Sequence, residues 1–215
     1  MSKKTMLLAL MVASAAMFAL PAAASAQEIH LEGVTSFEGT GGAGSFTAEG
    51  EPTFTCESTD IQGTVSAGGT TGTFSADTTG CHLTVFGFTA KCHTSGSALD
   101  NTIKSAGTFH LITIKNGVPG FLATPDTTTI VCAGISNTVI HGNIISTITS
   151  PACGVESTES TVKAVATGST QEHSIYTGVS FNLTTTTGEG GTSKSAGITA
   201  TGTFKSATAG KLNCT

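Results

Sequence analysis

Residues 80–93 read GCHLTVFGFTAKCH and contain two Cys-His dipeptides, Cys81-His82 and Cys92-His93, with nine residues between them. Cysteine paired with histidine is a ligand set for zinc, whereas two cysteines in one hairpin can close a disulfide. These alternatives predict different structures. The alternation of apolar and polar residues in the stretch distinguishes them.

An antiparallel hairpin with Cys81 opposite Cys92 separates the apolar residues from the polar ones. Its other opposed pairs are His82 with Lys91, Leu83 with Ala90, Thr84 with Thr89, and Val85 with Phe88. Cross-strand partners share a face and faces alternate along a strand, so the cysteines share one face with the apolar pairs. A register shift of one residue would mix the two faces. At the turn we expect a four-residue loop or a bulge, which would make the cysteines a closely spaced pair.

This hairpin argues against a zinc site built on the two cysteines. Adjacent strand residues point to opposite faces, so Cys81 and His82 cannot reach one ion, and the usual Cys-x2–4-Cys spacing is absent. The stretch therefore predicts a Cys81–Cys92 disulfide. His82 and His93 remain weak candidates for a metal or pH-sensitive pair on the exposed face, the alternative being a solvated polar surface.

The remaining cysteines extend the disulfide prediction. Six cysteines, an even number, in an exported chain favour three disulfides over free thiols. Many connectivities are open. Besides Cys81–Cys92 we favour Cys132–Cys153, which leaves Cys56–Cys214.

The first 26 residues are typical of a signal peptide. Two lysines precede an apolar run at residues 6–20, and residues 24–26 (ASA) are small, as a signal peptidase requires. That run is shorter than the about 20 residues of a membrane-spanning helix, and no later segment is apolar for long enough. We expect residues 27–215 to form a single domain with no transmembrane segment, secreted to the extracellular milieu or the cell surface.

The charge of the mature chain excludes a nucleic-acid binder. There is no arginine, and seven lysines remain against 14 acidic residues once residues 1–26 are removed. A protein that replaces phosphate counterions needs a cationic face, which these residues cannot supply. We expect an unidentified protein or cell-surface partner.

The composition predicts strands. The chain has 41 threonines and 27 glycines, which suit pleated surfaces and turns respectively. The clearest alternation lies in IYTGVSFNLTT (175–185), which predicts a strand with one buried face, and ITATGTFK (198–205) repeats the pattern. GTFHLITIK (107–115) is apolar on both faces and predicts a central strand, followed by a turn at Asn116-Gly117.

Two further segments are glycine-rich. FEGTGGAGSF (37–46) predicts a loop near the mature N-terminus. The tripeptide GTF occurs at Gly72, Gly107 and Gly202 without a fixed period, so we interpret it as a consequence of composition. Together these features predict a disulfide-stapled, all-β fold, an antiparallel β-sandwich with a β-barrel as the alternative.

No catalytic motif is recognisable, so the sequence predicts no catalytic residue and no cofactor. The motif TGCHLTVFGFTAKC (79–92), with the glycine- and threonine-rich strands, resembles exported bacterial proteins of unassigned function. That resemblance implies an all-β secreted domain and brings no catalytic residues. We expect a structural or interaction protein. The alternative is an extracellular hydrolase whose site is assembled from distant strands.

Overall fold

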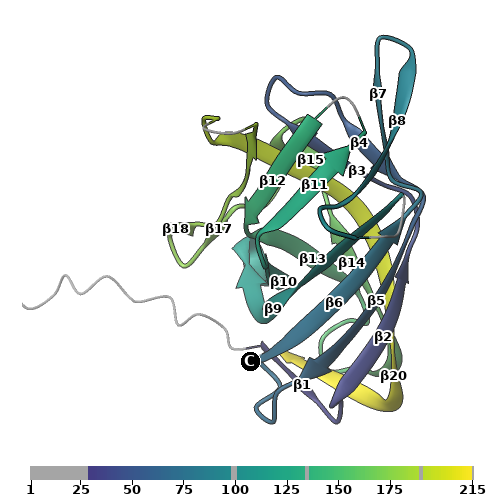
Figure 1. The fold of residues 1–215 in the computed structure, drawn as a ribbon. Helices are drawn as coiled ribbons and strands as arrows, with labels where there is room; N and C mark the ends of the chain where they lie inside the picture. Colours follow the sequence, from purple (N-terminus) through teal and green to yellow (C-terminus); the bar gives the residue numbers. More distant parts are fainter. Residues whose placement is uncertain (1–28, 98–100, 134–135, 189–190, 215) are drawn as a thin grey trace, which may run out of the picture.

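The computed structural model describes residues 29–97, 101–133, 136–188 and 191–214, and the expected signal peptide lies outside them. Most of these residues belong to antiparallel strands that are interrupted halfway along their length (Figure 1). The interruptions divide the strands into two stacked sets, which we call the lower tier and the upper tier.

Each tier is a ring of eight strands. The lower tier runs in the order β14 (Glu156–Ala164), β13 (Ile144–Ser150), β10 (Val118–Pro125), β9 (Thr102–Ile114), β6 (Thr71–Thr79), β5 (Ser58–Val65), β2 (Ser36–Gly41) and β20 (Lys194–Cys214). The upper tier runs in the order β20, β19 (Leu183–Thr187), β12 (Ser136–Gly142), β11 (Thr128–Cys132), β8 (Phe88–Thr94), β7 (His82–Val85), β4 (Phe54–Cys56) and β3 (Gly44–Ala48).

The long strand β20 closes both rings. It pairs with β2 and β14 in the lower tier and with β3 and β19 in the upper tier. The predicted all-β antiparallel fold is confirmed, and the architecture is the barrel rather than the sandwich. A sandwich would leave sheet edges open, whereas here the last strand pairs with the first ones.

Short elements complete the fold. β1 (Ile29–Glu32) pairs with the end of β20, and the 3-10 turn η1 (Lys115–Gly117) joins β9 to β10. The excursion between β14 and β19 holds the small hairpins β15 (Ala166–Thr167) with β16 (Thr170–Gln171) and β17 (Ile175–Tyr176) with β18 (Val179–Ser180). The predicted turn at Asn116-Gly117 is confirmed, with φ of 69° and 76°.

Two predictions about segments are wrong. Residues 175–185 are not one strand, because Thr177 and Gly178 adopt positive φ and fold the first half into the β17–β18 hairpin. Ile175 and Val179 are 61% and 54% exposed. Residues 37–46 are not a loop, since they form most of β2 and β3, where glycines give space to side chains from other strands.

The central strand β9 is covered on both sides, as its sequence predicts. Phe109 and Leu111 belong to the core inside the lower tier. Ile112 and Ile114 face outward and are buried under the excursion, against Tyr176 and other apolar residues.

The copies of GTF occupy related positions in the fold, which composition alone does not predict. In the β6–β9 ladder two copies lie opposite each other, with Gly72 facing Phe109 and Phe74 facing Gly107. A Cβ on Gly72 would lie 2.5 Å from the Phe109 ring. The third copy places Phe204 over Gly39 in the β2–β20 ladder.

Four inward phenylalanines, Phe37, Phe109, Phe121 and Phe204, contact one another in a closed ring, the Phe belt, which crosses the interior of the lower tier. The ring centroids are 5.8 Å apart for Phe37–Phe109, 4.7 Å for Phe109–Phe121, 6.2 Å for Phe121–Phe204 and 5.3 Å for Phe204–Phe37. Edge and stacked contacts at such distances stabilise aromatic clusters. The belt holds together strands that are distant in the sequence.

The β7–β8 hairpin has the predicted register: Leu83 lies opposite Ala90, and Val85 lies opposite Phe88. Cys81, Leu83, Ala90 and Cys92 are buried, as the face assignment requires. Phe88, which the alternation assigns to the same face, is instead 76% exposed because it lies next to the turn. The turn is the two-residue loop Phe86-Gly87 rather than the expected four-residue loop or bulge, and both residues have positive φ.

All six cysteines form disulfides, but the three predicted pairings are wrong. The bonds are Cys56–Cys81, Cys92–Cys132 and Cys153–Cys214. The two-residue turn makes Cys81 and Cys92 a hydrogen-bonded pair, with Cys92 N donating to Cys81 O at 2.9 Å. Such pairs are about 5.5 Å apart at Cα.

The neighbouring strands set other cysteines directly opposite these two. Cys56 on β4 is 4.0 Å from Cys81 at Cα, and Cys132 on β11 is 4.1 Å from Cys92. Each of the two hairpin cysteines therefore bonds to the neighbouring strand outside the hairpin, Cys81 to β4 and Cys92 to β11. Cys132–Cys153 and Cys56–Cys214 fail because Cys56 and Cys132 pack in the core of the upper tier, whereas Cys214 packs in that of the lower tier.

Candidate functional site

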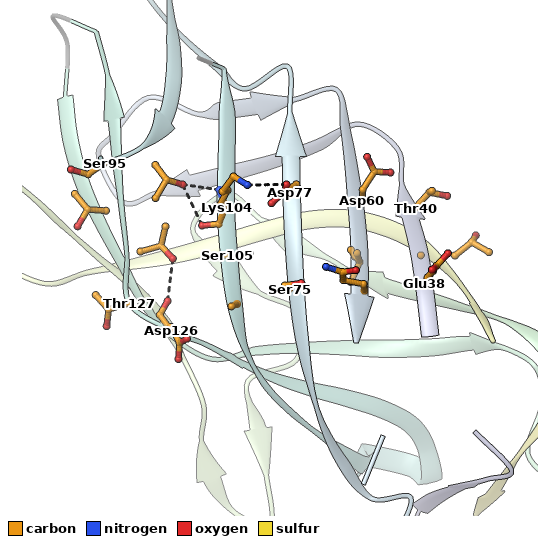
Figure 2. A pocket seen from close by; sticks show the side chains of 18 of the residues that line it. Glu38, Thr40, Asp60, Ser75, Asp77, Ser95, Lys104, Ser105, Asp126 and Thr127 are labelled. Carbon is orange, nitrogen blue, oxygen red and sulfur yellow. Dashed lines mark hydrogen bonds and ion pairs between the residues drawn. The ribbon is translucent and has the colours of Figure 1, made fainter. Parts of the chain in front are cut away.

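A polar groove of about 1080 Å³ runs across the outer face of the lower tier (Figure 2). Its floor is formed by the outward residues of β20, β2, β5, β6 and β9. Ser95 and the segment at Asp126–Thr129 line the groove where the chain enters and leaves the upper tier. The groove thus exists because the strands are interrupted between the tiers.

The register of the ladders aligns the floor residues in two rows that cross five strands. The first row is Lys205, Glu38, Gln62, Ser75 and Ala106. The second row is Thr203, Thr40, Asp60, Asp77 and Lys104. Every neighbour in a row is a directly opposed cross-strand pair.

The second row contains an unfavourable pair. Asp60 and Asp77 are directly opposed on β5 and β6, where like charges destabilise a sheet. Lys104 Nζ donates to Asp77 Oδ2 at 3.2 Å, as Figure 2 shows. In the part of the chain that the structure describes, the exposed Asp60 carboxylate has no cationic partner, so only one of the two charges is balanced by an ammonium group.

The groove carries a net negative charge. Its lining has four carboxylates, on Glu38, Asp60, Asp77 and Asp126, and two ammonium groups, on Lys104 and Lys205. Lys205 forms its ion pair with Glu159 at 3.5 Å rather than with the opposed Glu38. Both groove ion pairs are largely exposed, and exposed pairs hold their side chains only weakly.

His82 is engaged on both ring nitrogens. Nδ1 lies 3.0 Å from the Gly80 carbonyl, which only accepts, so this nitrogen carries the proton. Nε2 lies 2.9 Å from the Thr55 hydroxyl, which can donate to it or accept from it. His93 lies opposite Val131 on β11, whereas His82 lies opposite Thr55 on β4. The two histidines predicted as weak metal candidates therefore have different neighbouring strands.

Two observations bear on metal and hydrolase chemistry. Across residues 29–97, 101–133, 136–188 and 191–214, no group of three or more His, Cys, Asp or Glu side chains is placed to hold a metal ion. The described residues that line the groove provide carboxylates and hydroxyls but no histidine. Thr55–His82 and Thr184–His141 are hydrogen-bonded pairs between opposed strand residues, away from the groove lining.

The tip of the β7–β8 hairpin exposes two aromatic side chains. Phe86 is 97% exposed and Phe88 is 76% exposed. Phe86 also has φ of 49°, a conformation that is unfavourable for a bulky residue. In Figure 1 the hairpin projects beyond the rest of the barrel.

Sequence reasoning missed the groove. Its acidic residues are separated by 17 or more positions, since Asp60 and Asp77 lie on different strands, and no spacing links them. The sequence did contain one signal: several segments with apolar–polar alternation carry a single acidic residue on the polar face. Examples are Glu38 in FEG and Asp77 in FSAD. Reading that signal required knowledge of which strands are neighbours.

In the part of the chain that the structure describes, no helix has the length and apolar character needed to cross a membrane. The three disulfides are compatible with an oxidising compartment. Comparison of the chain with protein-family models, with curated proteins and with solved structures finds no match in any of the three.

Proposed function

We propose that the protein is a secreted interaction protein that binds a basic, lysine- or arginine-rich segment of an extracellular or cell-surface partner in the polar groove. The observation that carries this proposal is the opposed pair Asp60 and Asp77, of which only Asp77 has a cationic partner. A basic side chain placed between the two carboxylates would remove the repulsion and gain a charge-assisted hydrogen bond.

The rest of the groove supports a polar, extended occupant. The two rows provide hydroxyl, amide and carboxylate groups across five neighbouring strands, and Glu38 and Asp126 add negative charge on either side of the central pair. Seven lysines against 14 acids in the expected mature chain would attract a basic partner from a distance. The disulfides suit a scaffold that works outside the cell.

The test uses a fluorescein-labelled hexalysine peptide, with hexaglutamate as the matched control probe. We expect fluorescence anisotropy to show binding of hexalysine at about 20 mM NaCl that weakens at about 200 mM NaCl. The double variant Glu38→Gln/Asp60→Asn should weaken binding about tenfold. The proposal is wrong if hexalysine does not bind or hexaglutamate binds equally well.

A second double variant separates the groove from net charge. Glu156→Gln/Glu172→Gln removes the same charge from two exposed residues outside the groove lining. It should change the affinity less than about twofold. An equal loss of hexalysine affinity in both double variants would show that the peptide is attracted by the total charge of the protein and does not bind at the groove. Asp60→Asn alone should also raise the free energy of unfolding by about 0.5 kcal/mol at low salt, because it removes the opposed like charge.

A further inference from the structure

A second cavity, of about 210 Å³, lies inside the barrel where the two tiers meet; we call it the chamber. On one side are Ile144 and Ile198, which also pack against the core of the upper tier. On the other side are Phe37, Phe121 and Phe204 of the Phe belt. The chamber therefore lies between the core of the upper tier and the Phe belt.

The interior is incompletely filled at this level. Phe37, Phe74 and Phe204 point inward, yet each keeps part of its surface accessible, unlike the buried Phe46 and Phe54 of the upper tier. Protein cores are normally packed as densely as organic crystals. Glycines and alanines at inward positions leave the space, because they carry little or no side chain.

The chemistry of the lining selects the ligand. The wall is mostly carbon, and its polar groups are hydroxyls on residues such as Ser105 and Ser146. Among the described residues that line the chamber, none is charged. An ion would lose its hydration without compensation there, whereas an apolar molecule would gain contact with the walls.

The size and the wall set further limits. An apolar cavity of about 150 Å³ holds one benzene, so this chamber has room for one six-membered ring with a small substituent. Gly41 and Gly42 line the chamber at the break between β2 and β3. Gly42 is exposed, and a Cβ there would meet no atom within 4 Å, so the space beside this residue is open.

We propose that the chamber is a binding site for a small, neutral, mainly apolar molecule with a single ring, which the chamber hydroxyls can orient if the ligand carries one hydroxyl group. The chamber lies on the inner face of the sheet whose outer face forms the groove, and Ile61 and Ser105 line both. The proposal for the chamber does not depend on the function proposed for the groove. The inner face of the barrel contacts this ligand, and the outer face contacts a partner.

The first experiment compares toluene, benzyl alcohol and benzoate, which share a ring and differ in polarity and charge. Thermal unfolding followed by circular dichroism should show that toluene and benzyl alcohol raise the Tm by about 5 °C or more at a hundredfold excess over Kd. Benzoate should leave the Tm unchanged. No shift with the neutral ligands, or an equal shift with benzoate, overturns the proposal.

Variants locate the site. Ala200 lines the chamber, so Ala200→Leu should fill it and abolish the Tm shift with toluene. Ala207→Leu, at an exposed position of the same strand, should keep the full shift. Retention of the shift in Ala200→Leu overturns the assignment.

A third experiment uses only the wild-type protein, so its result does not depend on whether the variants fold. It is a crystal structure determined under xenon pressure. Xenon is an apolar probe that enters dry cavities of this size. It should appear between Phe74 and Ile198, and an empty chamber under xenon contradicts the proposal.

Discussion

Gly72 on β6 lies directly opposite Phe109 on β9, and the Phe109 ring occupies the space in which a side chain at residue 72 would begin. The Thr64 carbonyl closes the same space from the other side, 2.0 Å from an added Cβ. The Phe109 ring therefore packs directly on the backbone of β6 at Gly72. The glycine is required by this packing rather than by a turn.

Gly72→Ala should lower the free energy of unfolding by about 1–3 kcal/mol, because the added methyl group overpacks a site that has no room. Urea unfolding followed by circular dichroism measures this. Gly68→Ala is the control: its Cβ would meet only the Thr70 hydroxyl, at 3.9 Å, and its effect should stay within about 0.5 kcal/mol. Equal stability of the two variants would contradict the Gly–Phe packing.

The disulfide pattern predicts a distinctive digest. Lysines at 91, 104, 115 and 163 place Cys56 and Cys81 in one lysyl fragment, ending at residue 91, whose bond is internal. Without reduction, fragment 92–104 should be linked to 116–163, and that fragment to the C-terminal one containing Cys214. Mass spectrometry that found fragment 92–104 joined to the N-terminal one would support Cys81–Cys92 instead.

Removing one bond should also be costly. Cys92→Ser/Cys132→Ser opens a loop of 40 residues, for which the chain-entropy model gives about 4 kcal/mol. The control Cys153→Ser/Cys214→Ser removes a bond at the other end of the barrel. The control opens the longer loop, of 61 residues, but Cys92 and Cys132 are 0% and 1% exposed, so serines there also bury two hydroxyl groups. The first double variant should therefore lose more stability than the control in urea unfolding, and an equal or smaller loss would contradict the role of burial.

The β17–β18 hairpin leads us to expect a large loss of stability for one isoleucine substitution and almost none for another. Ile145 is 1% exposed and packs with Ile112 under this hairpin, so Ile145→Ala should cost about 2–5 kcal/mol. Ile175 is 61% exposed, and Ile175→Ala should change stability by less than about 0.5 kcal/mol. A large loss of unfolding free energy for Ile175→Ala, measured by urea unfolding, would support instead the single strand that the alternation of residues 175–185 predicts.

The exposed hairpin tip should tolerate a polar turn residue. Phe86→Asn replaces a bulky residue at positive φ with one that adopts this conformation readily, next to Gly87. Because Phe86 is 97% exposed, little packing is lost, and the free energy of unfolding should rise by about 0.5–1 kcal/mol. Phe88→Asn, at an ordinary strand position, should give no such gain. A destabilised Phe86→Asn protein would show that the ring packs against the fold.

Local sequence pattern determined a good part of this protein. The alternation in residues 81–92 predicted the β7–β8 register and its buried face, and the two apolar faces of residues 107–115 predicted a doubly covered strand. Both succeed because side-chain direction along a strand depends only on the strand itself and on its hairpin partner.

Tertiary structure decided everything that depends on which strands are lateral neighbours. Cys81 bonds to Cys56 and not to Cys92, because β4, 25 residues back along the chain, lies beside β7 in a register that sets Cys56 opposite Cys81. The pairing of β20 with β2 and β3 makes a barrel, and the same ladders align Asp60 with Asp77 in the groove. Period-two alternation specifies the faces of a strand but not the order of strands, and the groove and the chamber are consequences of that order.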